Sequence, residues 1–128
     1  MGLIDSASNV LKFCNAGHNY PILISNDGKT KRLEEGGIIL GCVPEYPYAD
    51  GETELKKGDL LFIFTDGITE AMNSNKEEYG EEKLIEELTQ IKTKSCREIA
   101  DRILESVKTF ISGEEQSDDM TLLVIKKT

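Results

Sequence analysis

Two acidic triplets flank the two most apolar segments of the sequence. A Thr-Asp-Gly triplet around Asp66 directly follows the apolar run 60–64, and a Ser-Asp-Asp triplet around Asp118 precedes the run 121–125. If both runs are strands that pair in antiparallel orientation, the end of the first lies beside the start of the second, and Asp66 and Asp118 meet at one edge of the sheet. Two carboxylates held close together repel each other unless a cation neutralises them. Mg²⁺ and Mn²⁺ prefer oxygen ligands, and such an ion can activate a water or hold a phosphate.

Each triplet has a simpler interpretation when it is taken alone. Asp-Gly is a common turn sequence, and Asp-Asp is a common pair where a strand begins or a surface is solvated. Only the pairing of the triplets across two buried strands favours a metal site, so both interpretations stay open here. His18, which follows Gly17, is a similar case. It can serve as a base, a ligand or a phosphate contact, or it can be a hydrogen-bonded residue at the corner of a turn.

Composition argues against several other classes of function. The 128 residues include 24 acidic and 15 basic side chains, and the net charge of −9 argues against binding to nucleic acid or to an anionic membrane surface. No apolar stretch approaches the ~20 residues that span a bilayer. Cys14, Cys42 and Cys96 are widely spaced and form no CxxC pair, so neither a disulfide framework nor a zinc site is predicted. The N-terminus has no signal-peptide pattern, and reduced thiols in a cytoplasmic protein are expected.

The elements that must position the acidic triplets are mostly strands. Hairpins are predicted over 3–14 and 21–33, followed by loops and short strand pieces over the Gly- and Pro-rich stretch 36–58. The run 60–64 has the length and the continuous apolar character of a strand buried on both faces. This order predicts an α+β fold, a mainly antiparallel sheet with two C-terminal-half helices packed on it.

Two amphipathic helices are predicted between the two apolar runs. Residues 81–91 place apolar side chains on one face, and the acidic side chains of this helix are expected on a solvated face. Residues 96–111 repeat apolar side chains at helical spacing, which predicts a stripe that belongs to the core. Ser95 and Glu98 predict a capping box at the start of this helix, and Gly113 is expected to end it.

Several motifs, taken together, resemble those of bacterial PP2C-type serine phosphatases (the PPM family), in the branch that includes SpoIIE and RsbU. Each short motif is weak evidence alone, but their common order extends from residue 15 to residue 124. In that order they are Asn15-Ala16-Gly17-His18, Leu40-Gly41, Gly58-Asp59-x-Leu61, Thr65-Asp66-Gly67-Ile68-Thr69-Glu70-Ala71, Glu78-Tyr79-Gly80 and Asp118-Asp119-Met120-Thr121-Leu122-Leu123-Val124.

The resemblance implies metal-dependent hydrolysis of phosphoserine or phosphothreonine on a protein, by a water held between two Mn²⁺ or Mg²⁺ ions. It implies a fold that is part of an α-β-β-α sandwich. Matched by motif, Asp66 and Asp118 are metal ligands, while Asp119, Gly67 and His18 have at most supporting roles. The substrate expected in this branch is a phosphorylated STAS-type anti-sigma antagonist, so the protein would act in sigma-factor regulation.

The resemblance begins part-way into the family's domain. In the family, the first strands, two long helices and a carboxylate that bridges the metals lie upstream of the Asn-Ala-Gly-His motif. We therefore expect residues 1–128 to be a single, N-terminally incomplete phosphatase domain that binds metal weakly or not at all and is inactive in isolation. The alternatives are a non-catalytic regulatory or partner-binding module, and a bare folding unit. Because an incomplete sandwich exposes apolar sheet surface, homo-oligomers formed through that surface are also expected.

Overall fold

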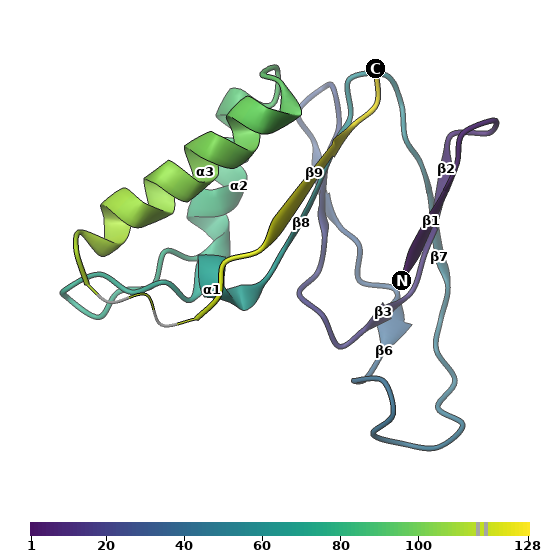
Figure 1. Ribbon diagram of the computed structural model, residues 1–128. Helices are drawn as coiled ribbons and strands as arrows, with labels where there is room; N and C mark the ends of the chain where they lie inside the picture. The colour runs from purple at the N-terminus through teal and green to yellow at the C-terminus, as the bar shows by residue number, and fades with distance from the viewer. Residues whose placement is uncertain (115, 117) are drawn as a thin grey trace.

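The fold has three layers, with helices on one side, a four-stranded sheet in the middle and a three-stranded sheet on the other side (Figure 1). The computed structural model describes residues 1–114, 116 and 118–128. In chain order the elements are β1 (Gly2–Asp5), β2 (Val10–Phe13), β3 (Asn15–Ala16), β4 (Ile22–Ile24), β5 (Thr30–Arg32), β6 (Gly36–Gly37), β7 (Gly51–Glu54), β8 (Leu60–Phe64), α1 (Asp66–Thr69), α2 (Glu81–Ile91), α3 (Cys96–Ile111) and β9 (Leu122–Lys126).

The middle sheet has the strand order β5-β4-β8-β9, and all its pairs are antiparallel. As predicted, β8 lies inside this sheet with buried side chains on both faces. It pairs with β9 so that Phe64 lies opposite Leu122 and Leu60 lies opposite Lys126. The end of β8 and the start of β9 therefore lie side by side at one end of the sheet. This end is the edge at which Asp66 and Asp118 were predicted to meet.

The second sheet has the order β1-β2-β7, and a short parallel pair joins β3 to β6. Both predicted hairpins are present, and the loop-rich stretch 36–58 contains β6 and β7. Leu11 and Phe13 of β2 pack against Leu23 and Leu61 of the middle sheet, which makes one core between the two sheets. The other face of this sheet is polar at its centre, where Lys12 and Glu52 form an ion pair of 2.7 Å.

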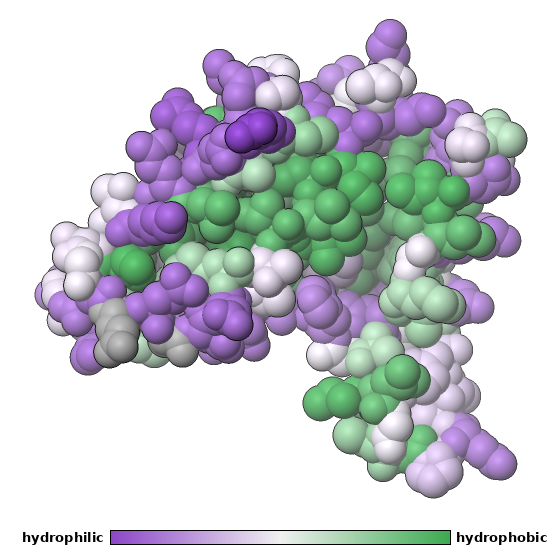
Figure 2. All heavy atoms as spheres, viewed as in Figure 1, coloured by the Kyte–Doolittle hydropathy of each residue, from purple (hydrophilic) through white to green (hydrophobic). Residues whose placement is uncertain are grey.

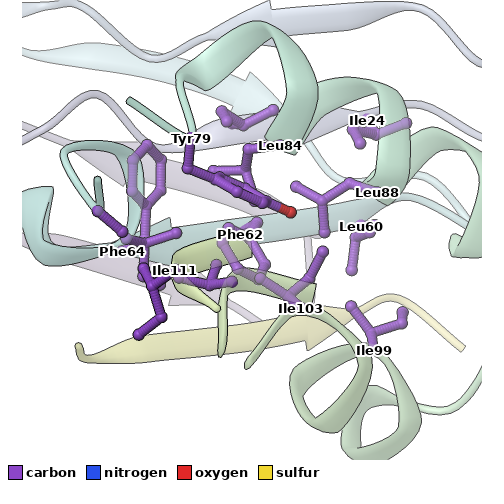
Figure 3. Close-up of a cluster of buried hydrophobic side chains, with 14 residues drawn as sticks. Ile24, Leu60, Phe62, Phe64, Tyr79, Leu84, Leu88, Ile99, Ile103 and Ile111 are labelled. Atoms are coloured by element: carbon purple, nitrogen blue, oxygen red, sulfur yellow. The ribbon is translucent and has the colours of Figure 1, made fainter. Parts of the chain in front are cut away.

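The helices form a second core against the opposite face of the middle sheet. Figure 3 shows Phe62 and Phe64 of β8 among side chains of α2 and α3. The apolar stripe of α3 is buried as predicted, and both reciprocal hydrogen bonds of the Ser95–Glu98 capping box are present. The helix ends at Ile111 as predicted: Ser112 adopts a left-handed conformation with φ of 50°, and Gly113, with φ of 90°, follows it.

The acidic residues of α2 are only partly solvated, so that prediction is wrong for two of them. Glu82 and Glu86 are exposed. Glu81 forms an ion pair with Arg32 of β5, and Glu87 accepts a hydrogen bond of 2.7 Å from Ser106 of α3. These two carboxylates therefore fasten α2 to its neighbours.

The α+β prediction, with a mainly antiparallel sheet covered by two helices, is confirmed. Within the described residues, no helix is both long and apolar enough to cross a membrane. The same part of the chain places no helix over the outer face of the β1-β2-β7 sheet (Figure 1).

Candidate metal site

Thr65 ties the segment after β8 to the segment before β9. Its backbone N–H donates to the carbonyl oxygen of Thr121 at 3.0 Å, and its hydroxyl donates to the carbonyl oxygen of Asp119 at 3.0 Å. The hydroxyl oxygen also accepts a hydrogen bond of 3.0 Å from the N–H of Thr121. The two acidic triplets are thereby held together through the backbone and one hydroxyl group.

Gly67 brings the two segments into direct contact. A Cβ atom added at this position would lie only 2.5 Å from the carbonyl oxygen of Asp119 and 3.3 Å from the carbonyl carbon of Asp118. Only glycine permits this close approach of two backbones. The predicted meeting of Asp66 and Asp118 at one edge of the sheet is present in the structure.

The carboxylates at this edge have the donor chemistry that a hard divalent cation requires. The Oδ1 atom of Asp66 accepts from the N–H of Gly67 at 3.0 Å, and the Oδ1 atom of Asp118 accepts from the N–H of Asp119 at 2.7 Å. Both side chains are exposed, as is that of Asp119. Within the described residues, no hydrogen bond occupies the Oδ2 atom of Asp66 or of Asp118.

The number of ligands is smaller than a complete metal site needs. In the part of the chain that the structure describes, no group of three or more His, Cys, Asp or Glu side chains converges to hold a metal. Mg²⁺ takes six oxygen ligands in octahedral geometry, several of which are usually waters. The donors therefore fit Mn²⁺ or Mg²⁺ in kind, but two aspartates supply only part of the coordination sphere. Ser117, in the second predicted triplet, lies outside the described residues.

His18 lies in a turn that Asn15 organises. The side chain of Asn15 is buried; it donates to the carbonyl oxygen of His18 and accepts from its N–H, both at 2.8 Å. Gly17, with φ of 88°, packs against the backbone of Ile39. The imidazole is exposed and lies 2.9 Å from the carbonyl oxygen of Asn19. These contacts match the corner interpretation, and none of the hydrogen bonds among the described residues joins His18 to Asp66.

The turn nevertheless lies near the candidate site. It leads into β4, which runs antiparallel to β8 with Ile22 opposite Phe62. The start of β4, the end of β8 and the start of β9 therefore share one edge of the sheet, and His18 precedes β4 by four residues in the chain.

Sequence reasoning did not identify Asp59 as a structural carboxylate. This side chain is buried, and it accepts hydrogen bonds of 2.9 Å from the N–H groups of Asn26 and Lys56. It fastens two turns at the end of the sheet opposite Asp66. In the sequence, the signal for this role is the position of Asp59 directly after Gly58. Gly58 has a φ of 90° and marks a tight turn, and the backbone N–H groups of such a turn need an acceptor.

Comparison with protein families matches residues 1–128 to the Stage II sporulation protein E (SpoIIE) family. Among curated proteins, phosphoserine phosphatase RsbU of Bacillus subtilis is 31% identical over 118 residues, which cover 90% of this chain and 34% of RsbU. The chain spans 15% to 34% of the curated relatives that it matches.

Solved structures agree with this match. The SiaA-PP2C domain of Pseudomonas aeruginosa has a TM-score of 0.85 at 18% identity, over 97% of this chain and 49% of that one. The phosphatase domain of SpoIIE from Bacillus subtilis, in a crystal presoaked with Mn, has a TM-score of 0.76 at 24% identity, over 99% of this chain and 55% of that one. The predicted PP2C-like fold is thus confirmed, and the chain spans about half the length of these solved domains.

Proposed function

We propose, since this chain belongs to the SpoIIE family of PP2C-type phosphatases, that it supplies one side of the metal centre of a protein serine/threonine phosphatase. The observation that carries the proposal is the contact of Gly67 with the Asp118–Asp119 peptide, which brings two carboxylates from distant parts of the chain to one sheet edge. A Mn-presoaked relative with the same fold supports the choice of metal.

Asp66 and Asp118 would hold Mn²⁺ or Mg²⁺ through their carboxylate Oδ2 atoms. When bound, such ions supply an activated water and neutralise the charge of the phosphate. The residues of this chain contribute position: the contact at Gly67 fixes the separation of the two segments, and the Oδ1 hydrogen bonds orient both carboxylates. Asp119 and His18 would have supporting roles at most.

The whole enzyme would remove phosphate from phosphoserine on a protein, with a STAS-type anti-sigma antagonist as the substrate. The name of the relative RsbU, a phosphoserine phosphatase, supports phosphoserine as the substrate class. Since the solved domains are about twice as long as this chain, the remaining metal ligands would come from polypeptide outside residues 1–128. The isolated chain should therefore bind metal weakly and turn over little or no substrate.

Calorimetric titration with Mn²⁺ tests the metal site. We expect weak binding, with a dissociation constant in the range of about 1 mM, corresponding to about −4 kcal/mol. Asp66→Asn and Asp118→Asn should each abolish the signal. Asp101→Asn, a matched change at an exposed aspartate of α3, should leave it intact. Equal binding by all four proteins would refute the assignment of Asp66 and Asp118.

A second assay separates an inactive fragment from a complete enzyme and from a regulatory module. Phosphate release from a phosphoserine peptide with Mn²⁺ should stay near background for this chain. Rates typical of an enzyme would show that residues 1–128 contain every necessary ligand. Binding of a STAS-type protein that is unchanged by Asp66→Asn and Asp118→Asn would favour the alternative of a non-catalytic partner-binding module.

A further inference from the structure

The segment that carries Asp118 has little apolar surface to hold it in place. In the connection between α3 and β9, residues 112–119 include no apolar side chain, and those of them that the structure describes are exposed. Figure 2 shows mostly hydrophilic residues at this end of the molecule, where α3 ends. The first apolar side chain after them, that of Met120, packs against the core under the helices. The position of Asp118 therefore depends on hydrogen bonds rather than on apolar packing.

Thr65 supplies the hydrogen bonds that join this segment to the rest of the protein. Among the residues that the structure describes, every hydrogen bond between residues 116–121 and another part of the chain is made with Thr65. The hydroxyl group of Thr65 donates to the carbonyl oxygen of Asp119 and accepts from the N–H of Thr121, both at 3.0 Å. The carbonyl oxygen of Thr121 lies farther from this hydroxyl group, at 3.5 Å. One hydroxyl group thus acts as donor and as acceptor toward a single neighbouring segment.

The hydroxyl group is not used for the role that its place in the chain favours. Thr65 is the N-cap residue of α1, and a threonine side chain at an N-cap usually accepts a hydrogen bond from a backbone N–H of the first helical turn. The backbone of Thr65 has the extended conformation of an N-cap, but its side chain makes no such hydrogen bond. The hydroxyl group bonds to Asp119 and Thr121 instead, so a local role in starting α1 does not account for it.

We propose that the hydroxyl group of Thr65 positions the carboxylate of Asp118 relative to that of Asp66. Thr65 directly precedes Asp66 in the chain, and its hydroxyl group binds the residue that follows Asp118, so one side chain connects the two proposed metal ligands. Thr65 is a positioning residue and not a ligand, and this inference rests on the proposed function. Replacement of a residue that orients metal ligands typically weakens metal binding about 10–100-fold.

The hydroxyl group of Thr65 and the absent side chain of Gly67 contribute in different ways. Gly67 lets the backbone of Asp119 approach, but a close approach alone does not hold an exposed segment in one place. The hydrogen bonds of Thr65 restrain direction as well as distance. Loss of the hydroxyl group should therefore widen the range of separations between Asp66 and Asp118 without adding bulk. A small ion with strict bond lengths should then bind more weakly.

Matched variants isolate the hydroxyl group in calorimetric titrations with Mn²⁺. Thr65→Val has a side chain of similar shape that neither donates nor accepts, and it should bind Mn²⁺ about tenfold more weakly than the wild type. Thr65→Ser keeps the hydroxyl group and should bind Mn²⁺ as the wild type does. Thr65→Ala differs from Thr65→Ser by the hydroxyl group alone and repeats the comparison without a branched side chain. Thr89→Val is the control: the partly buried hydroxyl of Thr89 donates to the carbonyl oxygen of Ile85 at 2.8 Å within α2, and its loss should leave Mn²⁺ binding unchanged.

Hydrogen exchange in metal-free buffer adds a measurement that does not depend on metal binding. The amide of Thr121 donates to the hydroxyl oxygen of Thr65, so it should exchange faster in Thr65→Val and Thr65→Ala than in the wild type and Thr65→Ser. Equal exchange in all four proteins would show that the hydroxyl group does not restrain the segment and would overturn the inference.

The titrations separate a failure of this inference from a failure of the proposed function. If the wild type, Thr65→Val and Thr65→Ala bind Mn²⁺ equally well, the metal site stands and Thr65 does not position it. Weakening that is as large in Thr65→Ser as in Thr65→Val would assign the effect to the methyl group and would also overturn the inference. Absence of Mn²⁺ binding by the wild type would refute the proposed metal site itself, and the inference with it.

Discussion

Replacing Gly67 with alanine tests whether the contact between the two acidic segments sets the metal site. The new Cβ would lie 2.5 Å from the carbonyl oxygen of Asp119, whereas ordinary contacts begin at 3.4 Å, so one backbone must retreat by about 0.9 Å. Overpacking of this kind costs about 1–3 kcal/mol. Alanine recovers up to about 1 kcal/mol, because Gly67 lies within α1 and alanine favours a helix. The net expectation is a loss of about 0–3 kcal/mol in the free energy of unfolding.

Gly67→Ala should weaken metal binding as well as stability. A shift of about 0.9 Å between the segments that carry Asp66 and Asp118 changes the separation of two ligands whose bond lengths to Mg²⁺ are held near 2.1 Å. We expect Mn²⁺ binding to weaken about tenfold, or about 1.4 kcal/mol.

Urea unfolding and calorimetric titration of the same samples measure both quantities. Gly2→Ala is a suitable control, because its Cβ would meet only ordinary contacts, the nearest of them Leu11 at 3.6 Å. If Gly67 serves only as a turn residue, Gly67→Ala should be as stable as the wild type or more stable and should bind Mn²⁺ equally well. That pair of results would refute the reasoning.

Three further changes test parts of the fold that support the site. Asp59→Ala leaves two backbone N–H groups without an acceptor and should lower the free energy of unfolding in urea by about 2–4 kcal/mol. The loss should be smaller for Asp59→Asn, which keeps one acceptor oxygen. Ser95→Ala should cost about 1 kcal/mol. The hydrogen bond from Ser95 lowers the pKa of Glu98, so its contribution is present above the pKa of Glu98 in the unfolded chain, and the difference between wild type and Ser95→Ala should shrink as pH falls through the lower pKa of the folded state. Burial raises the pKa of Tyr79 to about 12, so the wild type should lose stability as pH rises from about 10, and Tyr79→Phe should lack that loss in pH-dependent unfolding.

Local signals in the sequence predicted the helices well. The bounds of α2 and α3 agree with the predicted ranges 81–91 and 96–111, because apolar periodicity and the Ser95–Glu98 capping box are properties of neighbouring residues. The pairing of β8 with β9 was also predictable, since both strands are short, apolar and next to turn-forming residues. That pairing alone was enough to predict that Asp66 and Asp118 would meet.

What the sequence concealed depends on contacts between distant segments. Asp59 and Asp66 stand at the two ends of β8 and look alike in the sequence, yet Asp59 is 5% exposed and bonded to two backbone N–H groups, whereas Asp66 is exposed. Burial separates the structural carboxylate from the candidate ligand, and burial depends on the turns packed around each end. The strand β7 was equally hidden, because Gly51–Glu54 carries no apolar pattern and is a strand only through its pairing with β2.

The way the two aspartates are held bears on what the rest of a phosphatase domain has to provide. Thr65 joins the two segments through its backbone and its hydroxyl group, and Gly67 joins them through the close approach of its backbone to that of Asp119. Because those contacts do not require a cation, the proposed site would have both segments in position before a metal ion binds. The cost is a pair of like charges at one edge, which a bound cation would relieve. Under the proposed function, ligands from the rest of a phosphatase domain would therefore add coordination rather than shape, and we expect them to change metal affinity more than the fold of this chain.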